Sequence, residues 1–232
     1  MERSLKQVSS TGIPARKCKI CKKDIPEYSD AAICNDPKCF YSAVARSKNQ
    51  ENEILSAQHA GIPKMYENAK VTDFPKIDLS PTQKHLENNG SIFLPGDTGI
   101  GKTHLAAALS IASLHTIPTI TGYDFMWTRC PDLLMQIRST YNSDSDKTEQ
   151  QVVDSVRKVG LLVLDDLGAE KITDWSMSAF YAILASRVDE CRPTIVTSNL
   201  GLKQLHAWEP RIASRLASFN TVALPKVDRR IG

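Results

Sequence analysis

An octapeptide near the middle of the chain reads Gly96-Asp97-Thr98-Gly99-Ile100-Gly101-Lys102-Thr103, and it fits the P-loop pattern at every fixed position. The apolar run Ser91-Ile92-Phe93-Leu94 before it reads as a strand, and the run from His104 to Ala112 after it is rich in helix-forming residues. Strand, loop and helix therefore follow in the order that the motif requires. The pattern predicts a nucleotide-binding α/β domain, and a glycine-rich turn that matches by chance is the alternative.

The residue types of the octapeptide suit the binding of phosphate. Glycines let backbone N–H groups approach phosphate oxygens, and the N-terminus of the following helix attracts anions. Lys102 is expected to reach the β and γ oxygens of ATP, and the Thr103 hydroxyl is expected to bind Mg²⁺. We predict that ATP contacts all eight residues, which are Gly96, Asp97, Thr98, Gly99, Ile100, Gly101, Lys102 and Thr103.

A second apolar run, Leu161-Leu162-Val163-Leu164, ends in Asp165 and Asp166. A buried parallel strand presents its last side chains at the carboxyl edge of the sheet, where nucleotides bind. We predict that Asp165 holds the Mg²⁺ shell and that Asp166 faces the attacking water; a solvated turn is the alternative. Aspartate reaches one methylene less far than glutamate, which is compatible with slow hydrolysis.

Other segments alternate between strand and helix patterns. Strands are expected at 119–127 and 193–197, and helices at 82–88, 131–141, 151–158 and 175–188. Such alternation predicts a parallel sheet covered by helices on both faces. The polar segment 142–150 is expected to be a surface loop.

Three further positions extend the candidate ATPase site. Asn199 follows the strand at 193–197, so its amide would lie near the γ-phosphate or would cap a turn. Arg211 and Arg215 are four residues apart and share one helical face. From there a guanidinium would stabilise transition-state charge on a neighbouring subunit's nucleotide, or would form a surface salt bridge. Arg229 and Arg230 offer another phosphate contact.

The N-terminal segment carries four of the six cysteines, as Cys18-x2-Cys21 and Cys34-x4-Cys39. Two thiolate pairs with this spacing suit one tetrahedral Zn²⁺, although free thiols or a redox pair are alternatives. Metal binding would supply the folding energy that so short a segment lacks. We predict a zinc-binding module at 1–45, a helical linker at 46–62 and the ATPase domain at 63–232. Cys130 and Cys191 are expected to be packed small hydrophobes.

Composition sets the class of protein. The chain has 232 residues, of which 41% are hydrophobic and 24% are charged, as in an ordinary globular protein. No apolar stretch approaches the roughly 20 residues of a membrane span. The N-terminus has no signal-type hydrophobic segment, so we expect a cytoplasmic protein with no membrane partner. A net charge of +3 decides nothing about nucleic acid.

Five motifs in order carry a family resemblance: Gly61-Ile62-Pro63 with Thr72-Asp73-Phe74, the P-loop, the segment from Asp165 to Glu170, Thr197-Ser198-Asn199, and Arg211-x3-Arg215. Together they resemble the DnaC/DnaI/IstB family of AAA+ ATPases, over about residues 60 to 230. The resemblance implies P-loop roles for Lys102 and Thr103 and Walker B roles for Asp165 and Asp166. It also implies that Asn199 is sensor 1, Arg215 an arginine finger acting across a subunit interface, and Arg229 or Arg230 sensor 2.

The same resemblance implies a biological role. The expected function is loading of a DnaB-type replicative helicase, with self-association through the ATPase domain and hydrolysis triggering release. Family members bind single-stranded DNA after the second strand, here at 127–141, where Tyr141 or Arg138 would contact it; core packing explains Trp127 equally well. The zinc module would dock onto the helicase. The alternative is a transposition helper ATPase of the IstB type, which binds duplex DNA and recruits a transposase. A metabolic kinase lacks support, because no acceptor-binding motif is visible.

Overall fold

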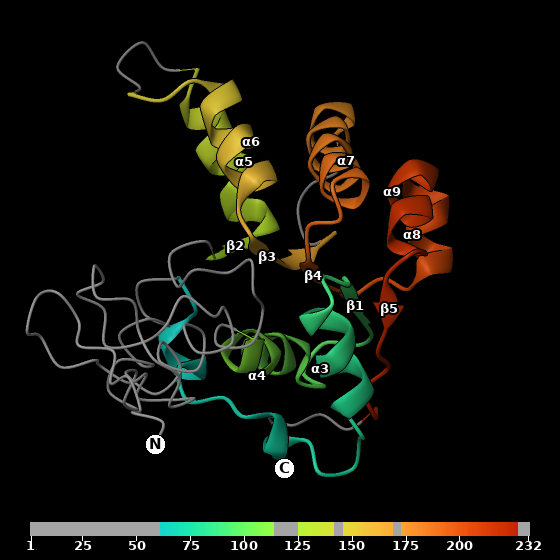
Figure 1. Ribbon diagram of the computed structural model, residues 1–232. Coiled ribbons are helices and arrows are strands. Elements are labelled where there is room, and N and C mark those ends of the chain that lie inside the picture. Colours follow the sequence, from blue (N-terminus) through green and yellow to red (C-terminus); the bar gives the residue numbers. More distant parts are fainter. Residues whose placement is uncertain (1–60, 114–124, 142–145, 169–172, 227–232) are drawn as a thin grey trace, which may run out of the picture. The chain divides into compact units, whose positions relative to one another are not determined.

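The computed structural model describes residues 61–113, 125–141, 146–168 and 173–226 (Figure 1). The predicted zinc ligands and the arginine pair near the C-terminus lie outside these ranges, as does nearly all of the predicted linker. Within them, none of the helices combines the length and apolar character that a bilayer crossing needs. The domain boundaries near residues 45 and 62 remain predictions.

Five parallel strands form one sheet in the order β2-β3-β4-β1-β5. The strands are β1 (Ile92–Pro95), β2 (Phe125–Arg129), β3 (Leu161–Leu167), β4 (Thr194–Ser198) and β5 (Asn220–Thr221). Every residue of β4 is buried, and only one residue of β3 is partly exposed. Burial on both faces explains the uninterrupted apolar runs in the sequence, and the predicted parallel sheet is confirmed.

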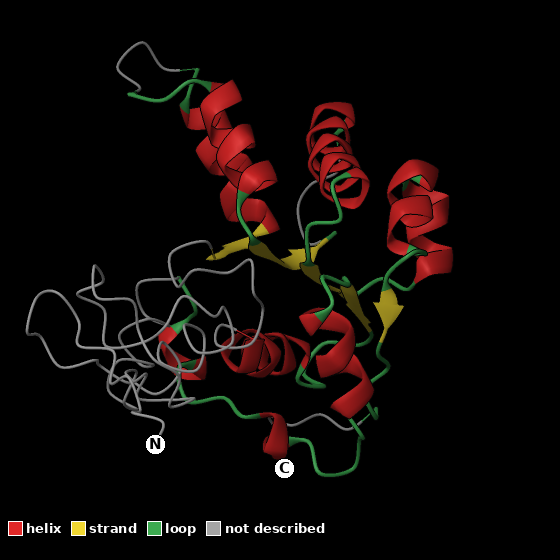
Figure 2. Ribbon diagram, viewed as in Figure 1, coloured by secondary structure: helices red, strands yellow, loops and turns green. Residues whose placement is uncertain are grey.

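Helices cover both faces of the sheet (Figures 1 and 2). On one face lie α3 (Ser80–Glu87) and α4 (Lys102–Ser113). On the other face lie α5 (Cys130–Ser139), α6 (Glu149–Lys158), α7 (Asp174–Asp189), α8 (Leu202–Trp208) and α9 (Pro210–Leu216). Strand side chains alternate between the two resulting cores: Ile92 and Leu94 of β1 join the first core, and Phe93 joins the second. The fold is the predicted α/β architecture, with all five carboxyl ends at one edge of the sheet.

Most helix boundaries differ from the predictions by one or two residues. The loop prediction for 142–150 is wrong at its end, because α6 begins at Glu149 and Thr148 is its N-cap. Thr148 and Gln151 form a capping box, which fixes the start of the helix within a polar stretch. The strand predicted at 119–127 is confirmed from Phe125 and extends to Arg129; residues 119–124 are outside the described ranges.

The two remaining cysteines differ. Cys130 is fully buried in the second core, as predicted. Cys191 is exposed, so its predicted packing is wrong. It lies in the turn between α7 and β4 with φ +50°, in the left-handed region that is uncommon outside turns.

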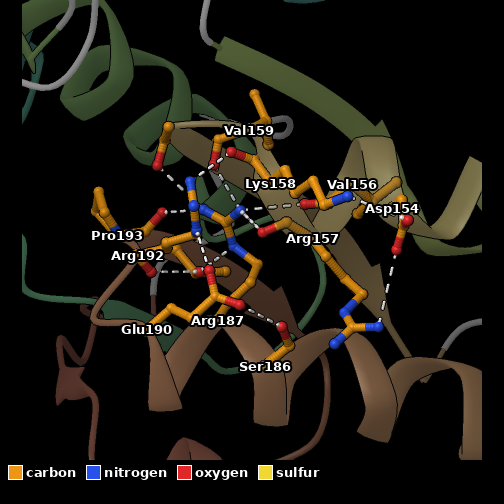
Figure 3. A network of polar contacts seen from close by, with 12 residues as sticks. Asp154, Val156, Arg157, Lys158, Val159, Ser186, Arg187, Glu190, Arg192 and Pro193 are labelled. Atoms are coloured by element: carbon orange, nitrogen blue, oxygen red, sulfur yellow. Dashed lines mark hydrogen bonds and ion pairs between the residues drawn. The ribbon is translucent and has the colours of Figure 1, made fainter.

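A buried arginine forms a hydrogen-bond network at the edge of the sheet where β3 and β4 begin, opposite the carboxyl ends of the strands (Figure 3). Arg187 of α7 has 0% of its surface exposed. Its Nε donates to the Thr194 hydroxyl at 2.8 Å, and its Nη atoms donate to backbone carbonyls at 2.7 to 3.1 Å. These carbonyls belong to Val156, Arg157, Val159, Gly160 and Pro193, at the end of α6 and just before β3 and β4. The guanidinium therefore joins three elements and satisfies the end of a helix.

Candidate nucleotide site

The P-loop connects β1 to α4 and depends on its glycines. Gly96, Gly99 and Gly101 have φ values of 140°, 87° and 99°, which side-chain-bearing residues rarely adopt. A Cβ at Gly96 would lie 2.6 Å from Cδ1 of Ile100. The Gly96 N–H donates to the Ser198 carbonyl at 3.1 Å, so the loop is also attached to the end of β4.

The Lys102 ammonium is held inside the curve of this loop. Its side chain is buried, and Nζ donates to the carbonyls of Gly96 at 2.9 Å and Asp97 at 2.8 Å. Nζ also donates to Oδ1 of Asn199 at 2.8 Å. The predicted P-loop lysine and the predicted sensor asparagine, 97 residues apart, are therefore in direct contact.

Asp165 lies beneath the loop and accepts two hydroxyl hydrogen bonds. Only 1% of the residue is exposed, and its Oδ1 accepts from Thr103 at 3.1 Å and from Thr197 at 2.7 Å. Burial raises the pKa of Asp165 above its ordinary value, and the Thr197 hydrogen bond opposes that shift. A nearby cation would favour the charged carboxylate. The two residues predicted to hold Mg²⁺, Thr103 and Asp165, are within hydrogen-bond distance of each other.

These residues fit Mg²⁺ as a partner of a triphosphate. Mg²⁺ prefers oxygen ligands and usually takes one or two carboxylates together with substrate phosphates and water. Asp165 supplies one buried carboxylate and Thr103 one hydroxyl. Among the described residues, no cluster of three or more His, Cys, Asp or Glu side chains is placed to hold a metal ion.

A cleft of about 350 Å³ opens over the P-loop. It brings together residues from the P-loop, from the ends of β3 and β4, and from the segment before α3. Its lining residues are Met65, Tyr66, Thr98, Gly99, Gly101, Lys102, Thr103, His104, Asp166 and Asn199. Of the predicted nucleotide residues that the structure describes, four do not line it: Ile100 and Asp165 are buried, and the carbonyls of Gly96 and Asp97 accept from Lys102.

One wall of the cleft was not anticipated from the sequence. The His104 ring lies 5.7 Å from that of Tyr66 between ring centroids and packs edge-on against Phe74 at 5.2 Å. Its Nε2 lies 2.8 Å from Oδ2 of Asp73. The Lys70 backbone N–H, followed by His104, lowers the pKa of Asp73. No local pattern signals this wall, because 38 residues separate Tyr66 from His104.

The two arginines of α9 are paired within the chain and do not line the cleft. Arg211 bonds Glu209 at 2.9 Å and lies 4.9 Å from the centroid of the Tyr181 ring. Arg215 Nη1 lies 3.2 Å from Oδ1 of Asp189, at the end of α7. Lys102 is thus the only Lys or Arg among the described residues that line the cleft. Within the described ranges, neither arginine of α9 reaches the cleft of its own chain.

The residues considered for DNA contact divide into two groups. Trp127 is 8% exposed and belongs to the first core, so packing accounts for its position. Arg138 lies over the Trp175 ring at 5.1 Å. The Tyr141 hydroxyl donates to Glu149 at 2.7 Å and accepts from Trp175 at 3.2 Å, and the Glu149 hydrogen bond raises its pKa. Arg138, Tyr141 and Trp175 form one cluster, which we call the aromatic cluster.

Two known replication proteins are similar to this chain in sequence. Replicative helicase loader DnaC of Buchnera aphidicola (strain APS) is 26% identical over 194 residues, which cover 75% of each protein. Chromosomal replication initiator protein DnaA of Tropheryma whipplei (strain Twist) is 26% identical over 157 residues, covering 65% of this chain and 30% of that protein.

Solved structures share the fold. A crystal structure of DnaI matches with a TM-score of 0.54 at 24% identity and covers 71% of this chain and 95% of that one. AMPPCP-bound DnaA from Aquifex aeolicus matches with a TM-score of 0.59 at 22% identity, and the match covers 73% of this chain and 53% of that one. A family model described as IstB-like ATP binding protein matches residues 62–216, which include the P-loop, both aspartates and Arg215. The chain therefore belongs to the IstB-like ATP binding family, within the DnaC/DnaI/IstB group of AAA+ ATPases.

Proposed function

We propose that this protein is an ATP-dependent loader of the replicative DNA helicase. The observation that carries the proposal is the cleft in which Lys102, Asp166 and Asn199 converge over the P-loop, in a chain similar to a replicative helicase loader over three quarters of both proteins. The first feature supports control by ATP, and the second supports the helicase as the object of that control.

The cleft residues have distinct roles in this proposal. Lys102 would donate to the β and γ oxygens of ATP in place of the loop carbonyls, and Thr103 and Asp165 would hold Mg²⁺, whose charge would offset that of the phosphates. Asp166 orients the attacking water, and Asn199 lies beside the γ-phosphate. The base is received beside Tyr66 and His104, because both aromatic rings line the cleft.

Hydrolysis in this proposal involves a second protomer, because Lys102 is the one Lys or Arg that lines the cleft within the described ranges. We propose that Arg215 supplies further positive charge for the transition state across a subunit interface. Its bond to Asp189 joins two partly exposed side chains, and such pairs contribute about 0–1 kcal/mol, so assembly can replace it. Arg215→Ala should keep ATP affinity within about 2-fold and lower the hydrolysis rate by about 1,000-fold.

Mixing two inactive variants tests whether this arginine acts between subunits. Lys102→Ala retains the finger and lacks nucleotide, whereas Arg215→Ala retains nucleotide and lacks the finger. An equimolar mixture should recover part of the wild-type hydrolysis rate. Arg211→Ala is the matched control on the same helix and should remain active. Full activity of Arg215→Ala alone would exclude the finger role.

Single-stranded DNA binding is proposed for the aromatic cluster. Trp175 and Tyr141 offer ring faces for base stacking, and Arg138 offers a cation for the backbone; stacking contributes about 1–3 kcal/mol per base. Trp175→Ala should weaken single-stranded DNA binding about 10-fold in fluorescence anisotropy. Tyr181→Ala removes an aromatic–arginine pair elsewhere on α7 and should have little effect. Tighter binding to duplex than to single strands would favour the transposition helper instead.

Capture of the helicase tests the function directly. The full-length chain should retain the replicative helicase of the same organism in the presence of ATP and release it as ATP is hydrolysed. We propose that one Zn²⁺, held by Cys18, Cys21, Cys34 and Cys39, folds the docking module. The double variant Cys18→Ser/Cys21→Ser should therefore lose both zinc, measured by metal analysis, and the helicase, while keeping ATP affinity. Capture of a transposase but no helicase would overturn the loader proposal.

A further inference from the structure

The end of β3 contains a bulge at the two aspartates. Leu164 pairs with Val196 of β4, and the next register pair is Leu167 with Ser198. Two residues of β3, Asp165 and Asp166, therefore lie opposite one residue of β4, Thr197. Asp166 takes up the extra length with φ +61°, a left-handed conformation in which aspartate is tolerated better than most residues.

Thr197 connects both halves of this bulge through one hydroxyl. The residue is fully buried, and its Oγ1 accepts the Asp166 backbone N–H at 2.9 Å. The same oxygen donates to Oδ1 of Asp165 at 2.7 Å. The two directions are compatible, because an amide N–H can only donate and thus leaves the hydroxyl hydrogen for the carboxylate.

The neighbouring serine strengthens the same end of the sheet. Ser198 Oγ donates to the Leu167 carbonyl at 2.6 Å and accepts the Leu200 N–H at 3.0 Å. Two successive hydroxyls of β4 therefore hold β3 at the bulge and directly after it, and Asn199 follows in the chain. The side chains that line the cleft from β3 and β4 share one hydrogen-bonded support.

We propose that Thr197 is a positioning residue that holds Asp165 toward the magnesium ion and Asp166 toward the cleft. This inference rests on the proposed binding of ATP with Mg²⁺. Packing alone does not require the hydroxyl, since valine has nearly the same shape as threonine and suits a buried strand at least as well. The hydroxyl is instead the group that satisfies the irregular backbone and orients the buried carboxylate.

A pair of substitutions separates the hydroxyl from the shape of the side chain. Thr197→Val removes the hydroxyl and keeps the volume, whereas Thr197→Ser keeps the hydroxyl. Binding of a fluorescent ATP analogue is titrated with Mg²⁺ and also measured in EDTA. We expect Thr197→Val to need at least about 10-fold more Mg²⁺ than the wild type for half-maximal enhancement of binding. Its affinity for the analogue in EDTA should stay within about 2-fold of wild type. Thr197→Ser should need an Mg²⁺ concentration within about 3-fold of the wild-type value.

Two controls complete the test. Ser110→Ala removes a buried hydroxyl that bonds only the Ala106 carbonyl within α4, and it should leave the Mg²⁺ requirement unchanged. If Thr197→Val does not fold, Thr197→Cys, whose thiol is a weak donor, should shift the requirement in the same direction. A wild-type Mg²⁺ requirement in the folded Val or Cys variant would overturn the proposed role of Thr197 and leave the proposed nucleotide site unaffected. Failure of the wild-type chain to bind the analogue would overturn the nucleotide site as well.

Discussion

Replacing Lys102 with alanine is expected to lower the affinity for ATP by about 100-fold or more. The ammonium is buried and already fixed by carbonyls of the loop and by Asn199, so it is oriented before a ligand arrives. Hydrogen bonds from a charged donor contribute about 1.5–3 kcal/mol each. Loss of two such bonds to phosphate corresponds to at least a 100-fold change, since 1.4 kcal/mol is tenfold. Titration calorimetry with ATP and Mg²⁺ measures the change.

A second lysine near the same loop is a matched control. Lys226 Nζ lies 3.8 Å from Oδ2 of Asp97, and 87% of its side chain is exposed. Exposed ion pairs contribute about 0–1 kcal/mol, so Lys226→Ala should change ATP affinity by less than about 5-fold. If Lys102→Ala retained wild-type affinity while Lys226→Ala lost it, the phosphate would have to bind at the outer side of the loop, and the proposed site would be wrong.

Replacing Arg187 with methionine is expected to lower the free energy of unfolding by about 3–5 kcal/mol. Methionine fills part of the volume and removes every donor, so the buried carbonyls at the end of α6 and just before β3 lose the guanidinium. The Pro193 carbonyl before β4 keeps the Leu162 N–H at 3.2 Å. Each buried group left without a partner costs about 1–3 kcal/mol. For a domain of this size the melting temperature should fall by about 6–20 °C, at about 2–4 °C per kcal/mol. Urea unfolding followed by circular dichroism measures the loss.

Controls distinguish this network from general surface effects. Arg192, nearby, is partly exposed and bonds Glu190 and the exposed Lys158 carbonyl, so Arg192→Ala should cost less than about 1 kcal/mol. Arg187→Lys retains a charge, yet an ammonium with three donors cannot span three elements, so most of the loss should remain. Arg187 lies at the sheet edge opposite the cleft, so the folded variant should bind ATP normally. A melting temperature unchanged in Arg187→Met would show that the network adds little.

Several site residues were predictable because their signals are local. The P-loop carries its glycines, Lys102 and Thr103 within eight consecutive residues, and the apolar run of β3 ends directly at Asp165 and Asp166. The rule that parallel strands end at one edge of a sheet then placed Asn199 beside them, and the Lys102–Asn199 contact agrees with this placement. The residues expected to contact the phosphates could therefore be predicted from contiguous motifs and from the rule that parallel strands end at one edge of a sheet.

Other residues had no signal in the sequence. In the sequence, nothing distinguishes Arg187 from an ordinary charged residue near the end of a helix, or Thr197 from an ordinary β-branched residue in a buried strand. Tyr66 and Trp175 each lie far along the chain from their partners, His104 and Tyr141. Their roles depend on which strands are neighbours, on the register between them and on the bulge in β3.

The amino-acid sequence by itself determined the class of fold, the phosphate-binding loop and the pair of aspartates, because each of these is encoded by residues adjacent in the chain. The tertiary structure alone decided how the carboxylates are supported, which aromatic residues form the wall of the cleft, and where a buried cation is satisfied. The physical reason is that these contacts join residues about 30 to 40 positions apart, such as Asp165 with Thr197 and Tyr66 with His104, and such contacts form only after the sheet has set its strand order and register.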